Sequence, residues 1–174
     1  MNRFISVLIA AFLACLWAAP AQADEIFGGV YIHDINSPLS KSNVEDGADI
    51  ELGWRGEPLT GLKIQPHAFV TLNTAGQTHF ASIGISRKFG DRIFIRPGVG
   101  IAVHTGSTGN FQIETNNKIE FGSRVLLAPE LGIGARLNSR MTIEASLVHL
   151  SHAQIFGKQN PGLDTVGVRL SYKL

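Results

Sequence analysis

Three polar residues near the C-terminus have the types and spacing of a nucleophilic hydrolase. His149 and Ser151 stand two residues apart, and Asp164 follows after an intervening stretch with Asn, Pro and Gly. A serine hydroxyl becomes an effective nucleophile when a histidine accepts its proton and a carboxylate orients that histidine. If the flanking segments form one β-hairpin, His149 and Ser151 share a face, and Asp164 can reach the ring from across the hairpin. This pattern predicts acyl transfer by a serine.

The segments that would carry these residues alternate between apolar and polar side chains. In residues 48–55, for example, Asp49, Glu51 and Arg55 fall on the face opposite the apolar residues. The alternation recurs in eight segments, roughly 25–34, 47–55, 61–73, 77–89, 92–105, 118–137, 140–152 and 163–174. Alternation with period two predicts strands, and eight is the smallest usual strand number of an outer-membrane barrel. The predicted fold is all-β, an eight-stranded antiparallel transmembrane β-barrel.

The polar faces of these segments predict a charged barrel interior. They carry both signs of charge, on Glu51, Arg55, Arg96, Glu120, Arg124, Glu130, Arg136, Glu144 and Arg169. Glycines fall on the same faces and would make room for long side chains in a narrow lumen. A soluble barrel that binds lipid in the periplasm would place the apolar faces inward instead. The segment 166–174, which alternates up to the C-terminal residue, favours lipid outside.

The N-terminus is predicted to be a cleaved signal peptide, residues 1–23. Arg3 precedes an apolar stretch, and Ala21-Gln22-Ala23 forms a small-x-small cleavage site. A lipoprotein with cleavage before Cys15 is the weaker alternative, because its apolar region would be short. The barrel domain would then be residues 24–174.

The mature chain left by this cleavage would be neutral and without cysteine. Loss of Arg3 leaves 14 basic against 14 acidic residues. Nucleic acid is therefore an unsuitable partner. No apolar run of about 20 residues follows the signal, which excludes a helical membrane anchor. The histidines lack the spacing of metal ligands, so no metal site is predicted.

The last two segments resemble the lipid A 3-O-deacylase family (PagL), whose members are eight-stranded outer-membrane barrels. The resemblance rests on HLSHA at 149–153, on KQNPG at 158–162 and on an acidic residue near the start of the last strand. The opening GGVYIHDI at 28–35 is also similar. The resemblance implies that Ser151 is the nucleophile, His149 the general base and later acid, and Asp164 the orienting carboxylate.

The resemblance also implies an oxyanion site just after the serine. It would use the backbone N–H of Ala153 with help from His152, while Asn160 and its neighbours could meet a phosphate or sugar of lipopolysaccharide. The family has Glu where this chain has Asp164, and Asn where it has His152. A histidine can still donate one hydrogen bond, in the right tautomer or when charged.

The expected function is that of an outer-membrane serine esterase without a cofactor. Its substrate would be the 3-O-linked hydroxyacyl chain of lipid A in the outer leaflet. The alternative is a non-catalytic, OmpX-like structural or adhesion barrel in which the hairpin tip has no chemical role. A homodimer stays possible, because apolar strands look the same against lipid or against a second copy.

Overall fold

The computed structural model describes residues 23–40, 43–59, 61–109, 116–153 and 161–174. Its strands are β1 (Ala23–Ile32), β2 (Ala48–Gly56), β3 (Gln65–Asn73), β4 (Phe80–Ser86), β5 (Phe89–Gly90), β6 (Ile93–His104), β7 (Val125–Arg136), β8 (Met141–Leu150) and β9 (Leu163–Lys173). Within the described residues, no helix is long and apolar enough to cross a membrane.

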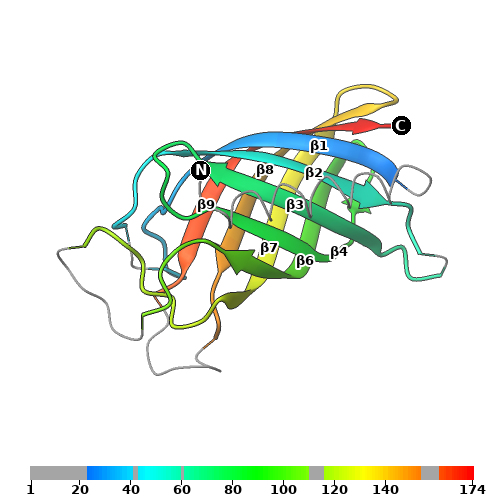
Figure 1. Cartoon of the computed structure of the whole chain (residues 1–174). Helices are drawn as coiled ribbons and strands as arrows, with labels where there is room; N and C mark the ends of the chain where they lie inside the picture. Colours follow the sequence, from blue (N-terminus) through cyan, green and yellow to red (C-terminus); the bar gives the residue numbers. More distant parts are fainter. Residues whose placement is uncertain (1–22, 41–42, 60, 110–115, 154–160) are drawn as a thin grey trace.

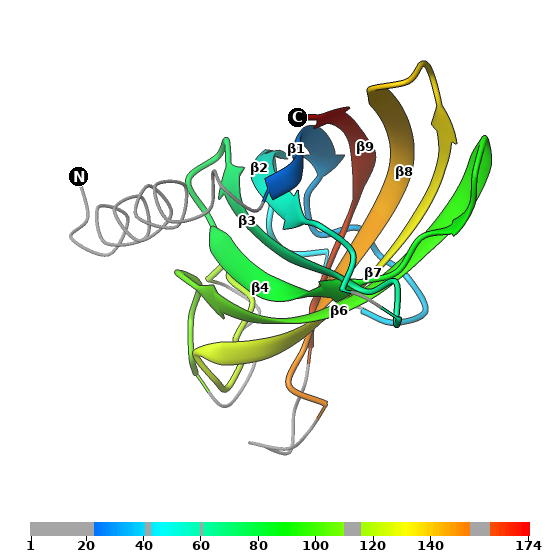
Figure 2. The same cartoon turned by 90° about the vertical axis from the view of Figure 1, so that its right-hand side faces the viewer.

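The strands close into a barrel. Strands that follow one another in sequence pair antiparallel, except β4 and β5, and β9 pairs with β1 (Figure 1). Both β4 and β5 pair with β6. Because β4 and β5 share one position in the sheet, the described residues form an eight-stranded barrel. The second view shows the strands curving around a common axis (Figure 2). The predicted fold class is confirmed.

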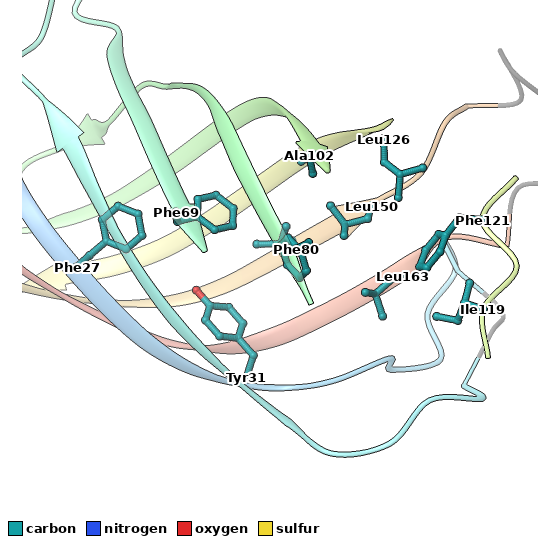
Figure 3. Packing of buried hydrophobic residues seen from close by; sticks show 12 residues of the cluster. Phe27, Tyr31, Phe69, Phe80, Ala102, Ile119, Phe121, Leu126, Leu150 and Leu163 are labelled. Atoms are coloured by element: carbon teal, nitrogen blue, oxygen red, sulfur yellow. The ribbon is translucent and has the colours of Figure 1, made fainter. Parts of the chain in front are cut away.

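Two predicted strand segments differ from the observed strands. The segment 77–89 is interrupted between β4 and β5, and the segment 118–137 becomes a strand only at Val125. Ile119 and Phe121 alternate with polar residues as strand residues do, but they are 0% and 1% exposed and belong to the hydrophobic cluster shown in Figure 3. Their alternation comes from a connecting segment that folds onto the core.

The exterior of the barrel is apolar and its interior is charged. Val30, Ile83 and Ile101 are 58%, 64% and 53% exposed, whereas Arg55 and Arg169 are 0% and 1% exposed. This inversion of the usual soluble pattern is that of a membrane-spanning barrel, in which lipid covers the apolar face. The alternative of a soluble barrel with apolar faces inward is therefore not favoured.

Ion pairs satisfy most of the interior charges. The guanidinium group of Arg169 lies 2.7 Å and 2.9 Å from the two carboxylate oxygens of Glu51, and 3.1 Å from Glu130. Glycine makes room for this network, since a Cβ at Gly98 would come within 2.7 Å of the Glu130 side chain. These contacts confirm the prediction of a paired interior, because a buried charge is tolerated when it is paired and hydrogen-bonded.

The prediction of interior positions for Arg124 and Arg136 was wrong. Both residues are exposed, because Arg124 precedes β7 and Arg136 ends it. Arg124 donates hydrogen bonds of 2.7 Å and 2.8 Å to the backbone carbonyls of His104 and Gly106, and Arg136 lies 2.7 Å from Asp91. Arg124 lies before β7, and Arg136 is the last residue of β7 at the mouth of the barrel, so alternation near a strand end does not ensure a buried position.

The connections differ between the two ends of the barrel. Residues 33–47, 74–79, 105–124 and 151–162 connect strands at one end, and 57–64, 87–88, 91–92 and 137–140 connect them at the other, so the longest connections share the first end. Both the start of β1 and the end of β9 lie at the short-turn end, where the Leu174 N–H donates to the Asp24 carbonyl. In outer-membrane barrels short turns face the periplasm. Residues 1–22 of the predicted signal peptide lie outside the described residues.

Candidate active site

The candidate catalytic residues gather at the tip of the β8–β9 hairpin. His149 pairs directly with Asp164 in the antiparallel register, one step from the pair Leu150–Leu163. Leu150 and Leu163 are 0% exposed and lie inside the barrel (Figure 3). Since successive residues of a strand point to opposite faces, His149 and Asp164 lie on the outward side of the wall.

His149 and Asp164 form a hydrogen-bonded pair. The distance from His149 Nδ1 to Asp164 Oδ1 is 2.5 Å, and the carboxylate side chain is 0% exposed while the ring is 13% exposed. A carboxylate accepts hydrogen bonds only, so this contact places the proton on Nδ1 and leaves Nε2 as the ring nitrogen that can accept a proton. The pair therefore has the form of a general base held by an acid.

The connection between β1 and β2, residues 33–47, covers this pair on its outer side. The Ser37 hydroxyl donates a hydrogen bond to Asp164 Oδ2, and the Ile35 N–H donates to the Asp164 carbonyl at 2.9 Å. Both carboxylate oxygens of Asp164 are thus occupied, one by His149 and one by Ser37. Asp164 lies on the outward face of β9, yet it is removed from lipid by this connection.

Further hydrogen bonds attach the same segment to the beginning of β9. The Ser40 hydroxyl bonds the carbonyls of Pro161 and Gly162 at 2.9 Å and 3.1 Å. Gly162 has φ +69°, and a Cβ there would lie 3.1 Å from His149 Cε1. Glycine therefore serves two purposes at this position, because it permits the left-handed backbone and lets the imidazole ring pack closely.

The base of the β1–β2 connection is anchored by a buried histidine. His33 Nδ1 lies 2.9 Å from Asp49, and its Nε2 lies 3.0 Å from Glu45. Burial would lower the pKa of His33, but the hydrogen bonds to Asp49 and Glu45 outweigh burial and raise it to about 9. His33 is therefore charged at neutral pH and ties the start of the connection to its end.

Glu45 is held by several donors besides His33. It accepts hydrogen bonds from the Thr78 hydroxyl at 3.0 Å and from the Ile119 N–H at 3.1 Å. Burial would raise the pKa of Glu45, but the hydrogen bonds from His33, Ile119 and Thr78 outweigh burial and lower it. Three separate connections are thus linked above the long-loop end of the barrel.

Ser151 is fixed through its backbone just beyond β8. Its N–H and carbonyl exchange hydrogen bonds of 3.1 Å and 2.7 Å with Leu127 of β7. Leu127 is 38% exposed on the exterior, and paired residues of antiparallel strands point to the same face. In the described part of the chain no hydrogen bond joins the side chains of Ser151 and His149. In unliganded sites such bonds often tighten only in the complex with substrate.

The residues expected to bind the oxyanion differ in their placement. His152 is 0% exposed, whereas Ala153 is exposed and has a positive φ of 50°, a conformation uncommon for residues other than glycine. The unusual conformation immediately follows Ser151-His152, where the chain leaves the strand and turns. Asn160 lies outside the described residues.

Sequence reasoning missed Ser37 and Ser40, and it named Gly162 only as part of the KQNPG motif without a role. The contact from Ser37 to Asp164 spans 127 positions in sequence. The signal that could have found it is barrel closure: if the first and last strands pair, the segment after β1 must lie beside the segment before β9. No group of three or more His, Cys, Asp or Glu side chains in the described ranges is arranged to hold a metal ion.

Comparisons with known structures agree with this architecture. The outer-membrane enzyme PagL is 18% identical with a TM-score of 0.58, covering 86% of this chain and 99% of its own. Neisserial surface protein A is 11% identical with a TM-score of 0.55, covering 86% and 96%. A de novo designed transmembrane β-barrel is 12% identical with a TM-score of 0.50, covering 88% and 98%. At these identities the likeness shows the barrel fold.

Comparison at the level of sequence identifies the family. No curated protein matches the chain. The family described as lipid A 3-O-deacylase (PagL) matches residues 47–173, which include β2 to β9 and all three candidate catalytic residues. Because the match covers more than half of the sequence, the chain belongs to the lipid A 3-O-deacylase (PagL) family.

Proposed function

We propose that this protein is a serine esterase of the outer membrane that hydrolyses the 3-O-linked hydroxyacyl chain of lipid A. The observation that carries the proposal is the pair of His149 and Asp164 beside Ser151, at the long-loop end of a barrel of the lipid A 3-O-deacylase family. In an outer-membrane barrel the long loops face the cell exterior, so they lie next to the outer leaflet, which contains lipid A.

The surroundings of Ser151 suit an acylated substrate that arrives through the membrane. Leu127, its backbone partner, is 38% exposed, and Val125 is 42% exposed on the same outer wall. Leu39 of the β1–β2 connection is 61% exposed. An acyl chain could lie along this apolar wall with its ester at the level of Ser151, since apolar surface favours contact with hydrocarbon. Lateral diffusion would bring the substrate, and no cofactor is required.

In the proposed mechanism, Ser151 Oγ attacks the ester carbonyl as His149 Nε2 accepts the hydroxyl proton. Asp164 stabilises the imidazolium through Nδ1. The tetrahedral intermediate expels the sugar 3-oxygen, which takes the proton from His149, and the acyl group stays on Ser151. His149 then activates a water molecule, which attacks the acyl-enzyme and releases the 3-hydroxy fatty acid.

Stabilisation of the oxyanion is assigned to the turn after Ser151. The Ala153 N–H is the proposed donor, because the positive φ of Ala153 redirects the backbone immediately behind the nucleophile. His152 and Asn160 remain proposed contributors to the oxyanion and substrate sites. Ser37 is a positioning residue: its hydrogen bond fixes the orientation of Asp164 but does not reach the substrate.

The test is mass spectrometry of lipid A from a heterologous outer membrane that contains the wild-type protein or Ser151→Ala. Loss of one hydroxyacyl mass with the wild type and not with Ser151→Ala is the expected result. Ser139→Ala, in the short β7–β8 turn, is the matched control and should behave as the wild type. Heat-modifiable gel mobility reports whether each barrel is folded.

The same experiment separates the esterase from the OmpX-like alternative. If the folded wild-type protein leaves lipid A intact, the non-catalytic barrel is the better interpretation. If Ser151→Ala retains deacylation, the assignment of the nucleophile is wrong even though the activity stands. The cleaved signal peptide, proposed for residues 1–23, is tested by the N-terminal sequence of the protein recovered from the membrane.

A further inference from the structure

The short-turn mouth of the barrel contains a basic cavity far from the candidate catalytic residues. The cavity has a volume of about 550 Å³. Six cationic side chains line it: Lys63, Lys88, Arg96, Arg136, Arg140 and Lys173. The lining contains two carboxylates, Asp24 and Glu25. The excess of positive charge contrasts with the neutral total expected for the mature chain.

Three of these cations already contact carboxylates. Lys173 Nζ lies 3.3 Å from Asp24, and Arg136 Nη2 lies 2.7 Å from Asp91 outside the cavity. The buried Arg96 lies 3.4 Å from both Glu25 and Glu144, and it donates a hydrogen bond to a glutamine side chain. These contacts belong to the interior network and the rim.

The other three cations have no carboxylate within salt-bridge distance among the described residues. Lys88 Nζ lies 4.2 Å from the centre of the Phe94 ring, so a neutral group positions its charge. Arg140 Nη1 donates a 3.0 Å hydrogen bond to the Tyr172 hydroxyl, which is also neutral. Lys63 completes the lining from the β2–β3 turn. Among the described residues, these three cations therefore take no part in the ion pairs of the rim.

We propose that this cavity binds the phosphate group of an anionic ligand. A concave site in which one sign of charge predominates concentrates its field and attracts the opposite ion; here six cations line the cavity with two carboxylates. Lys and Arg are the usual phosphate-binding side chains, and the volume lies in the range of about 300–1,000 Å³ typical of small-molecule sites. At the periplasmic rim, the phosphate can belong to an inner-leaflet phospholipid headgroup or to a soluble periplasmic compound.

The experiment measures binding to the full-length mature barrel. In zwitterionic micelles, pyrophosphate is titrated by isothermal calorimetry. In nanodiscs of phosphatidylcholine, with or without phosphatidylglycerol, thermal unfolding is recorded. Saturable pyrophosphate binding indicates a site open to soluble phosphate, and stabilisation by phosphatidylglycerol alone indicates the lipid headgroup. Either result supports the proposal, and neither depends on esterase activity.

A double variant and a matched control decide whether the cavity is responsible. Lys88→Gln/Arg140→Gln removes two of the cations that no carboxylate contacts, and binding should weaken roughly tenfold or more. Arg92→Gln changes a cation in the same rim region that does not line the cavity. Absence of binding in both settings, or equal weakening by Arg92→Gln, would overturn the proposal. Deacylation of lipid A should be unchanged in the double variant, whose substitutions lie at the opposite end of the barrel.

Discussion

Replacement of Ser37 by alanine is expected to lower kcat for lipid A deacylation while leaving KM nearly unchanged. The Ser37 hydroxyl donates to the oxygen of Asp164 that does not contact His149. Without it, the buried carboxylate loses one of two side-chain partners and can rotate away from the ring. The substrate does not touch Ser37 in the proposed site, so binding in the ground state should be little affected.

The expected magnitude follows from the kind of hydrogen bond that is lost. A hydrogen bond to a charged group contributes about 1.5–3 kcal/mol. Because about 1.4 kcal/mol changes a rate tenfold, the full loss would reduce kcat by roughly 10- to 100-fold. Asp164→Asn should reduce kcat further, since it removes the charge that stabilises the imidazolium.

The assay compares three variants at matched levels of folded barrel. Ser37→Thr keeps the hydroxyl and should recover most of the activity. Ser40→Ala removes another anchor of the same segment, the hydrogen bonds to the carbonyls of Pro161 and Gly162, and leaves the hydroxyl next to Asp164 in place. It should therefore lower kcat by much less than Ser37→Ala does.

Two results would refute this reasoning. If Ser37→Ala shows wild-type kcat, the hydrogen bond to Asp164 has no role in catalysis. If Ser40→Ala and Ser37→Ala lower kcat equally, or threonine fails to rescue Ser37, the effect comes from general loosening of the segment. A rise in KM with unchanged kcat would also contradict the positioning role, because it would indicate loss of substrate binding.

Three further predictions concern the buried charges and the packing around the site. Burial would lower the pKa of His33, but Asp49 and Glu45 raise it from 6.5 to about 9 in the folded state. The charged histidine therefore stabilises the folded protein by up to about 3 kcal/mol below pH ~6.5, and this contribution is lost as the pH rises through about 9. His33→Gln should remove this dependence, measured as hydrogen exchange of the β1–β2 connection. Gly162→Ala would place a Cβ 3.1 Å from His149 Cε1 and should lower deacylation in a folded barrel; Gly76→Ala, with a similar φ of +75° and no atom within 4 Å of the added Cβ, should not. Arg169→Gln leaves buried carboxylates without their cation and should destabilise the barrel by about 3–5 kcal/mol, measured by urea unfolding; an unchanged midpoint would contradict the assigned ion pairs.

The strands could be predicted from sequence because side chains alternate every second residue, and this alternation places them in turn on the inner and the outer face of the barrel. Asp49, Glu51 and Arg55 fall on one face of β2 by alternation, and all three are buried in the interior. The same rule failed where pairing ends. Ile119 and Phe121 alternate without forming part of β7, because burial against the core also selects apolar residues in a connecting segment.

In the candidate site, too, the contacts within one hairpin could be predicted from sequence, whereas the contacts that depend on barrel closure could not. The contact of His149 with Asp164 is local, since one hairpin register places them opposite each other, and sequence spacing was sufficient to predict it. The role of Ser37 depends on closure of the sheet, which unites the two ends of the chain. The burial of Asp164 also depends on that closure. The sequence therefore predicted that Asp164 lies on the lipid side, but it did not predict that the β1–β2 connection covers it.

The hydrogen bond from Ser37 to Asp164 requires that β1 is paired with β9, because Ser37 follows β1 and Asp164 lies on β9. Ser151 and His149 belong to the β8–β9 hairpin, whereas Ser37, which donates a hydrogen bond to Asp164, follows the first strand. A chain in which β1 and β9 are not yet paired keeps the contact of His149 with Asp164 but lacks the Ser37 hydrogen bond to the second carboxylate oxygen. If the proposed esterase depends on this contact, its activity would be highest once β1 and β9 are paired and the barrel is closed.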